Sequence, residues 1–227
     1  MSRSILCLAN TAGGSGKTTL AHALSVAFTE YGKKTLLIDL DPRANLSFRV
    51  GRENSRLNIS DFLQSTVTVE DLDTHIERFD FIASDSRCGF GFSDTDLNNL
   101  IDALPKEFDV IVIDTPSDVN AGLIAALNVS DLVLIPYSQT LHHYRGIDQI
   151  CKLAPKTKRV LLQIGKPSKI ADQFSQWAHL DGRCSTAREI GEAELTVTSV
   201  LTTAKNSVIA GEIRESAYSV LEELGIA

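Results

Sequence analysis

Ala-Gly-Gly-Ser-Gly-Lys-Thr-Thr, residues 12–19, is the most informative stretch of this 227-residue chain. An apolar run at residues 5–9 precedes it, and residues 18–31 follow it with apolar side chains at helical spacing. Glycines let backbone N–H groups converge on an anion, and a helix N-terminus adds partial positive charge. The order of strand, glycine turn and helix therefore predicts a phosphate-binding loop. The alternative is a glycine turn that binds no ligand.

The residue types in this loop suit a nucleotide. Lys17 can reach the β- and γ-phosphates, and the Thr18 hydroxyl can reach Mg²⁺. The usual pattern of Gly, four residues and Gly-Lys-Ser/Thr fails because residue 11 is Thr, but the variant Lys-Gly-Gly-x-Gly-Lys-Thr-Thr fits except at its first position, Ala12. The residues expected to contact the nucleotide are Gly13, Gly14, Ser15, Gly16, Lys17, Thr18 and Thr19.

Two further apolar runs end in aspartate. Residues 35–38 lead into Asp39-Leu40-Asp41-Pro42, and residues 110–113 lead into Asp114-Thr115-Pro116. Ligands of open α/β sheets bind at the carboxyl ends of the strands, so we expect these aspartates to converge with the glycine loop in one crevice. An aspartate after a buried central strand is typical of a Mg²⁺-side carboxylate. For Asp39 and Asp41 the alternative is a helix cap or a turn.

At these three motifs the chain resembles the ParA/MinD family of deviant Walker ATPases. The resemblance implies one doubly wound α/β domain over residues 1–227, with the P-loop NTPase fold and a mostly parallel sheet of about seven strands. It also implies ATP and Mg²⁺ as cofactors. Carried over by motif, Lys17 and Asp41 are catalytic, with Asp41 orienting the attacking water. Thr18, Asp39 and Asp114 serve the metal.

The resemblance extends to a homodimer that sandwiches ATP. In the family the leading lysine of the glycine loop reaches the partner's nucleotide, and Ala12 removes it here. Some relatives of the McdA type use a later lysine instead, which makes Lys152, ahead of Lys156 and Lys158, a candidate nucleotide contact. Where the family has Gln after Asp-x-Asp-Pro, this chain has Arg43.

The function implied by the resemblance is a slow ATPase that positions or partitions a plasmid, chromosome or organelle. It would act through nonspecific DNA binding and an adaptor protein of the ParB/McdB type. One rival is an ATP-binding switch with little hydrolysis, acting in regulation or conjugative transfer. A second rival is a metabolic P-loop enzyme, although the four scattered cysteines offer no spacing for a metal cluster.

Composition and charge indicate where in the cell the protein acts and what its surface can bind. No apolar run approaches the roughly 18 residues of a membrane span, and no signal-peptide pattern is evident, so we expect a cytoplasmic protein without membrane binding, associated with the nucleoid if it binds DNA. The net charge is −7, yet residues 145–188 alone carry +6. That segment is either a solvated basic face or a patch for DNA phosphates.

Elsewhere the patterns are weaker. They favour helices at 69–79 and 170–190 and a last strand at 195–201, with the turn at 165–169 near the adenine. His75 is expected at the surface rather than as a ligand, and the adjacent pair His142-His143 is expected not to bind metal. Phe90 and Phe92 lie in a Gly/Ser/Asp-rich loop and either tuck beneath it or join a dimer interface.

Overall fold

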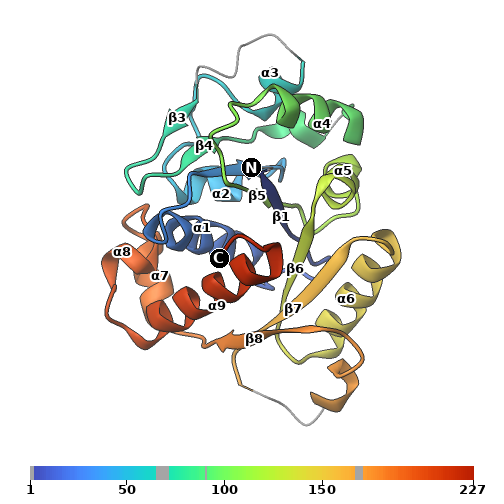
Figure 1. The fold of residues 1–227 in the computed structure, drawn as a ribbon, viewed down its shortest axis with the longest axis vertical. Helices are drawn as coiled ribbons and strands as arrows, with labels where there is room; N and C mark the ends of the chain where they lie inside the picture. The colour runs from blue at the N-terminus through green and yellow to red at the C-terminus, as the bar shows by residue number, and fades with distance from the viewer. Residues whose placement is uncertain (1–2, 65–71, 90, 167–170) are drawn as a thin grey trace.

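One mostly parallel sheet organises the protein in the computed structural model, which describes residues 3–64, 72–89, 91–166 and 171–227 (Figure 1). Its order is β3-β4-β2-β5-β1-β6-β7-β8, and only the β3–β4 pair is antiparallel. The predicted α/β fold is confirmed, with eight strands in the described ranges instead of about seven. The strands are β1 (Ser4–Leu8), β2 (Thr35–Asp39), β3 (Asp73–Thr74), β4 (Asp80–Ile82), β5 (Val110–Asp114), β6 (Leu132–Tyr137), β7 (Lys158–Ile164) and β8 (His179–Cys184).

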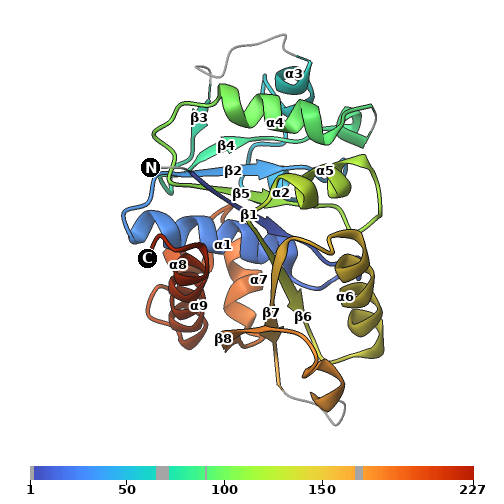
Figure 2. The same cartoon turned by 45° about the vertical axis from the view of Figure 1, so that its right-hand side comes forward.

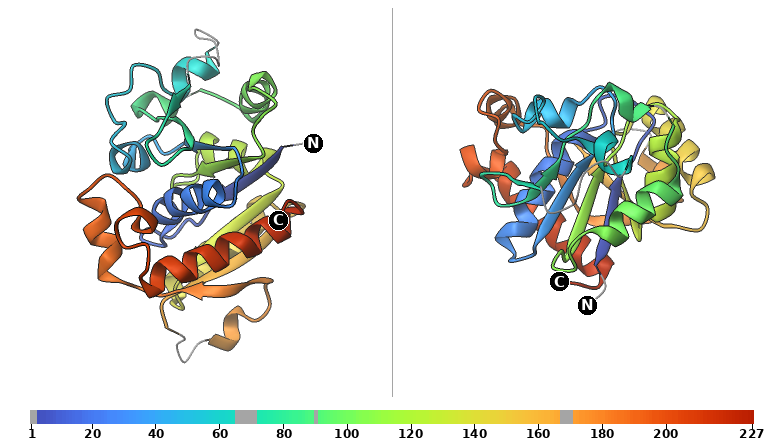
Figure 3. Two further views of the ribbon diagram at one scale, coloured as in Figure 1. Left: turned by 60° about the vertical axis from the view of Figure 1, so that its left-hand side comes forward. Right: turned by 90° about the horizontal axis from the view of Figure 1, so that it is seen from above.

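Helices cover both faces of the sheet, as a doubly wound fold requires (Figure 2). On one face α9 packs against α1 and β8, and on the other α4 packs against α5 (Figure 3). The helices are α1 (Lys17–Glu30), α2 (Asn45–Arg49), α3 (Ile59–Leu63), α4 (Asp94–Ala103), α5 (Ala121–Val129), α6 (Leu141–Leu153), α7 (Arg188–Glu194), α8 (Val200–Thr203) and α9 (Val208–Leu224), with short 3₁₀ turns η2 (Ser86–Gly89) and η3 (Ala171–Phe174).

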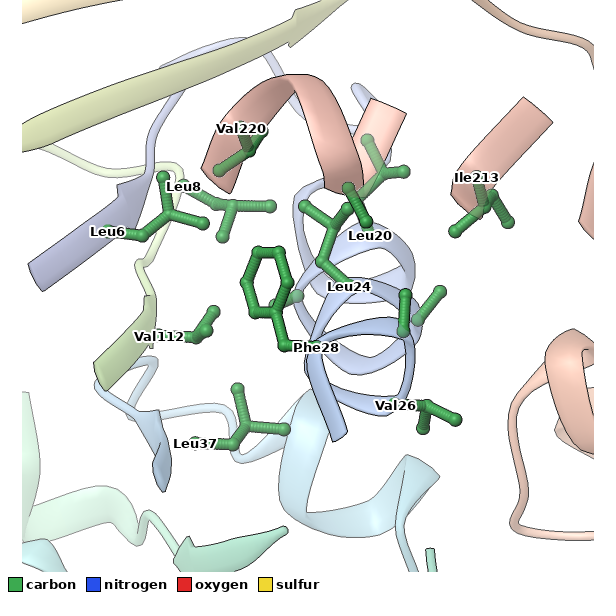
Figure 4. Close-up of a cluster of buried hydrophobic side chains, with 14 of the residues drawn as sticks. Leu6, Leu8, Leu20, Leu24, Val26, Phe28, Leu37, Val112, Ile213 and Val220 are labelled. Carbon is green, nitrogen blue, oxygen red and sulfur yellow. The ribbon is translucent and has the colours of Figure 1, made fainter. Parts of the chain in front are cut away.

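Strict alternation along the strands builds the two cores. In β5, Val110 and Val112 join the core under α1 and α9, while Ile111 and Ile113 join the core on the opposite face. Phe28 of α1 fills the centre of the first core among aliphatic side chains from the sheet and α9 (Figure 4). Strands apolar on both sides are the signature of a buried parallel sheet, which is why these runs were readable in the sequence.

Parallel strands bring their carboxyl ends to one edge. Asp39 ends β2 directly beside Asp114, which ends β5, and Leu8 at the end of β1 pairs with Asp114 on its other side. The glycine loop leaves β1 at this same edge. Three motifs that are far apart in the sequence therefore meet at one place.

The weaker predictions fail in the outer parts of the fold. The described part of 69–79 holds the short strand β3 and a turn, not a helix. Within 170–190 lie η3 and the edge strand β8, and residues 195–201 form a turn and the start of α8 rather than a strand. Phe92 is buried, as the tucked alternative expects, whereas Phe90 lies outside the described residues. In the described ranges, no helix is both long enough and apolar enough to cross a bilayer.

Candidate nucleotide site

The glycine loop forms one wall of a cavity of about 250 Å³ at the carboxyl edge of the sheet. Gly14 and Gly16 have φ values of 71° and 91°, the left-handed region that favours glycine. Helix α1 starts at Lys17 without a side-chain cap and without an acidic residue in its first turn. Its first N–H groups therefore remain available to an anion. The cavity is lined by Gly13, Gly14, Ser15, Gly16, Lys17, Thr18, Thr19, Asp41, Arg43, Asn45 and Ser117.

Lys17 is buried at this wall, and its ammonium group is held from two sides. It donates to the Asn10 carbonyl oxygen at 3.0 Å and to the Ser117 hydroxyl at 2.9 Å. Burial lowers the pKa of Lys17, while the nearby carboxylates of Asp114 and Asp41 act in the opposite direction. Both hydrogen-bond partners of this cation are uncharged, and a phosphate would supply an anionic one.

Asp114 is the residue whose surroundings most favour a cation site. Its side chain is fully buried at the end of β5, and neither carboxylate oxygen has a hydrogen-bond partner in the described part of the chain. Burial, followed by the charge of Asp39, raises the pKa of Asp114 to about 8. A buried carboxyl group without a partner is costly, so the arrangement fits a site that receives a cation.

Asp39 has a different environment from Asp114. One of its oxygens accepts the Asp41 N–H at 2.9 Å, and the other accepts the N–H and the hydroxyl of Ser47 at 2.9 and 2.8 Å. Burial nevertheless raises its pKa to about 6. Asp39 thus ties the start of α2 to the end of β2. It lies beside Asp114, its partner on the neighbouring strand β5.

Asp41 projects from the loop after β2 and lines the cavity. Its Oδ1 accepts the backbone N–H of Arg43 at 3.0 Å and the Arg43 Nε at 3.3 Å. The same guanidinium group reaches Asp118 at 3.4 Å, on the loop that follows β5. Arg43 therefore bridges the two loops that face each other across the cavity.

Ala12 is enclosed by helix α6. It is fully buried, and its N–H donates to the Asn10 side chain at 2.8 Å. Gly146 of α6 lies so close that a Cβ there would be 2.2 Å from Asn10 Oδ1 and 3.2 Å from the Ala12 Cβ. The absence of a long side chain at residue 12 is thus matched by the close approach of this helix.

The structure brings most of the predicted site residues together. The seven loop residues and Asp41 line the cavity, with Asp39 and Asp114 at the strand ends beneath. Lys152 does not line it: it is exposed on the last turn of α6 and pairs with Asp148 at 2.7 Å. Ser117 lines it, as the resemblance predicts for the loop after Asp114-Thr115-Pro116. Sequence reasoning did not anticipate that Arg43 lines the cavity too, although its place directly after Asp-x-Asp-Pro was a usable signal.

The comparisons with known proteins agree with this geometry. The AAA domain matches residues 3–164. The sporulation initiation inhibitor protein Soj of Bacillus subtilis is 28% identical over 159 residues, 64% of this chain and 62% of Soj. The chromosome partitioning protein ParA of Caulobacter vibrioides is 28% identical over 168 residues, 68% of this chain and 63% of ParA. The chain thus spans less than two thirds of either relative.

Solved structures match the fold over almost the whole chain. Apo McdA of Cyanthece superposes with a TM-score of 0.83 at 18% identity, covering 96% of this chain and 99% of McdA. Cobyrinic acid a,c-diamide synthase of Mycobacterium smegmatis, solved with an ATP analogue and magnesium, has a TM-score of 0.81 at 22% identity, covering 97% and 95%. Because the AAA domain covers well over half of the sequence, the chain belongs to this family, and its similarity to Soj and ParA makes it a member of the ParA/MinD group of P-loop ATPases.

Proposed function

We propose that this chain, acting as one domain over residues 1–227, hydrolyses Mg·ATP slowly and uses the nucleotide cycle to position or partition a cargo. The cargo would be a plasmid, chromosome or organelle, held through DNA binding and an adaptor protein in the cytoplasm. The observation that carries the ATPase assignment is Asp114: its two buried oxygens have no hydrogen-bond partner in the described residues, and it ends β5 beside the end of β1, from which the glycine loop leaves. The partitioning role is supported by the named relatives Soj and ParA.

The side chains divide the work of phosphate and metal binding. The N–H groups at the start of α1 and the Lys17 ammonium group bind the phosphates. Thr18 and Asp114 supply the oxygen ligands that Mg²⁺ prefers. Asp39 acts through its neighbours, because its hydrogen bonds hold the Asp41 backbone and Ser47 in place. The metal's contribution is to neutralise charge that develops on the phosphate oxygens.

Asp41 is the group that would orient the attacking water. Arg43 occupies only its Oδ1, so its second oxygen can accept a hydrogen bond from water. Positioning one water for in-line attack is the main task that phosphoryl transfer leaves to a side chain. Held by the backbone N–H of Arg43, this carboxylate is fixed before the nucleotide arrives.

Dimerisation would complete the site. Ala12 cannot donate to a partner's nucleotide, so a cation from elsewhere would have to do so. Lys152 fits this role only across a dimer, since in its own protomer it pairs with Asp148 and does not line the cavity. Association in the presence of ATP would then also create the DNA-binding form.

Two rivals make different predictions. A binding switch would bind ATP and dimerise, but it would hydrolyse ATP no faster than its own Asp41→Ala variant does. One structural observation favours a metabolic enzyme: the fold is similar to that of cobyrinic acid a,c-diamide synthase. At 22% identity, however, this likeness concerns the fold alone. ATPase activity that rises when DNA and an adaptor are added would favour positioning over both rivals.

The Asp41→Ala variant tests the proposal. We expect it to retain ATP binding, to lose about 10²–10⁴-fold in kcat, and to accumulate as an ATP-bound dimer. Light scattering after size exclusion, with ATP and with ADP, measures the dimer, and phosphate release measures turnover. Asp118→Ala is the matched control, because this exposed aspartate contacts Arg43 from the facing loop.

Three outcomes would count against it. If the wild type binds no ATP, the ATPase assignment fails. If Asp41→Ala with ATP elutes like the wild type with ADP, the role of Asp41 is wrong. If the two proteins turn over equally slowly while both dimerise, the binding switch is the better description.

A further inference from the structure

A buried cluster of two histidines and one glutamate lies apart from the nucleotide cavity. His22 comes from α1, about one turn beyond the glycine loop, and His75 and Glu77 come from the turn between β3 and β4. The three residues are 1%, 4% and 6% exposed, so the expectation of a surface position for His75 is wrong. One donor atom from each residue can be chosen so that all three lie within 4.8 Å of one another.

The donor atoms face a common point. His22 Nε2 is 2.6 Å from Glu77 Oε2, and His75 Nδ1 is 3.7 Å from the same oxygen. The backbone N–H of Glu77 donates to His75 Nδ1 at 3.2 Å, so this nitrogen carries a lone pair rather than a proton. This lone pair now accepts the Glu77 N–H, so a cation would have to take the place of that N–H as its partner.

Outer contacts hold two of the three side chains in place. Glu77 Oε1 accepts the N–H of Ser199 at 2.9 Å and the Thr202 hydroxyl, both at α8, which lies beside α1 (Figure 1). The His75 ring stacks on Phe79 with ring centroids 4.6 Å apart. Partners of this kind orient metal ligands in proteins.

The other ring nitrogen of His22 takes no part in the contact with Glu77. His22 Nδ1 is buried and has no hydrogen-bond partner among the residues that the structure describes. Arg52, the cation whose charge acts on His75, is itself paired with Asp73 at 2.5 Å. Because the atom that meets Glu77 is Nε2, an ion in the cluster would leave Nδ1 unchanged, so the argument for a metal rests on the three donor atoms themselves.

We propose that His22, His75 and Glu77 bind one Zn²⁺, or a similar first-row divalent cation, through two imidazole nitrogens and one carboxylate oxygen. These donors suit zinc, which takes two histidines and a glutamate in known sites. Zinc bonds of about 2.0–2.1 Å keep ligands about 3.3 Å apart. The cation therefore replaces the proton now shared by His22 and Glu77, and this pair moves apart by about 0.7 Å, from 2.6 Å to about 3.3 Å.

The role of such a site is structural. The three ligands are buried and line neither the phosphate cavity nor the smaller cavity beside Ala12. A bound cation would instead fasten the β3–β4 turn to α1, and through Glu77 to α8. The proposal does not rest on the proposed ATPase function, because none of the aspartates at the strand ends takes part.

The test uses the intact chain, stripped by a chelator and kept in excess Mg²⁺ so that the aspartates at the strand ends do not take up the probe. Titration with Co²⁺ should give the visible bands of a low-coordinate nitrogen and oxygen site at one equivalent per chain. Zn²⁺ should displace the Co²⁺ and raise the melting temperature by about 5 °C or more at a hundredfold excess over Kd.

Variants assign the binding to the cluster. His75→Phe keeps the stacking on Phe79, and Glu77→Gln keeps an oxygen for His22; each should weaken Co²⁺ binding by at least about 100-fold. His142→Phe, at an exposed histidine on α6, is the matched control and should bind as the wild type does. If the wild type binds no stoichiometric Co²⁺, shows thiolate bands, or binds as tightly after His75→Phe, the cluster is only a hydrogen-bonded anchor and the proposal is overturned.

Discussion

Arg43 is the single residue that most distinguishes this site from the motif pattern around it. Its guanidinium group lies between Asp41 and Asp118 and lines the phosphate cavity, so it places a second positive charge opposite Lys17. A nucleotide phosphate would compete with the two carboxylates for this group. Arg43 can thus both orient Asp41 and stabilise charge on a phosphate.

We therefore expect Arg43→Gln to lower kcat for ATP by about 10- to 100-fold, with a smaller change in KM, because one preorganised donor to the developing charge is lost. Steady-state phosphate release measures both constants. Arg43→Lys keeps the positive charge but lacks the planar, paired N–H donors of the guanidinium group, so it should recover part of the lost kcat. Wild-type turnover in the Gln variant would show that Arg43 only closes the cavity wall.

At the scale of single residues, the sequence predicted what depends on local pattern. Gly14 and Gly16 were readable because only glycine adopts their backbone conformation freely, and Asp114 because a carboxylate after a buried strand has no packing reason. His75 was misread because its partner His22 is distant in sequence. Nothing local marks a histidine as buried when a remote helix supplies the contact.

At the scale of elements, helix α6 holds the start of the glycine loop, at Asn10 and Ala12, through one close contact. Gly146 is the point of closest approach, where a side chain would meet Asn10 and the Ala12 backbone. His143, one turn earlier on α6, accepts the Ser138 N–H at 2.7 Å and so fastens the helix to the end of β6. The position of the loop thus depends on how closely α6 can pack.

A pair of glycine substitutions tests this dependence. Gly→Ala within a helix usually stabilises by about 0.5–1 kcal/mol, and we expect this for Gly211→Ala on α9, where a Cβ meets nothing within 4 Å. Gly146→Ala should instead destabilise by about 1–3 kcal/mol and weaken ATP binding, because the new methyl group overlaps Asn10. Urea unfolding and nucleotide titration measure the two effects. Stabilisation by both alanines would contradict the close contact.

Element prediction failed where burial is one-sided or absent. Strand β8 is an edge strand whose residues are mostly exposed, so it lacks the continuous apolar run that revealed β2 and β5. Leu195 and Val197 suggested a strand by alternation but are 86% and 46% exposed in a turn. Hydrophobic periodicity in a sequence reflects which side chains are buried. Few side chains are buried at the margin of a sheet, so the pattern there is weak.

At the scale of the whole molecule, the basic segment is less uniform than its composition suggests. Three of its cations are neutralised within the protein: Lys152 by Asp148, Lys158 by Glu223 and Arg188 by Glu192. The sequence could count these charges but not pair them. Lys169 lies outside the described residues.

Three other cations of the segment lie at opposite edges of the sheet. Lys156 precedes β7 and therefore lies at the amino edge. Lys166 follows β7, and Arg183 pairs with Gln163 near the ends of β7 and β8, at the carboxyl edge that also carries the glycine loop. Both are exposed and have no ion pair in the described part of the chain. A DNA surface controlled by nucleotide would use this edge.

We expect the double variant Lys166→Glu and Arg183→Glu to weaken ATP-dependent binding to random-sequence DNA and to lower the slope of log K against log salt by about 2, one unit for each lost phosphate contact. Fluorescence anisotropy over a salt series measures the slope. Lys156→Glu is the control at the opposite edge and should leave the slope near its wild-type value. ATPase activity without DNA should also persist in the double variant, because neither residue lines the phosphate cavity. If Lys156→Glu weakens binding as much as the double variant, net charge alone governs the interaction, and the carboxyl edge has no special role in it.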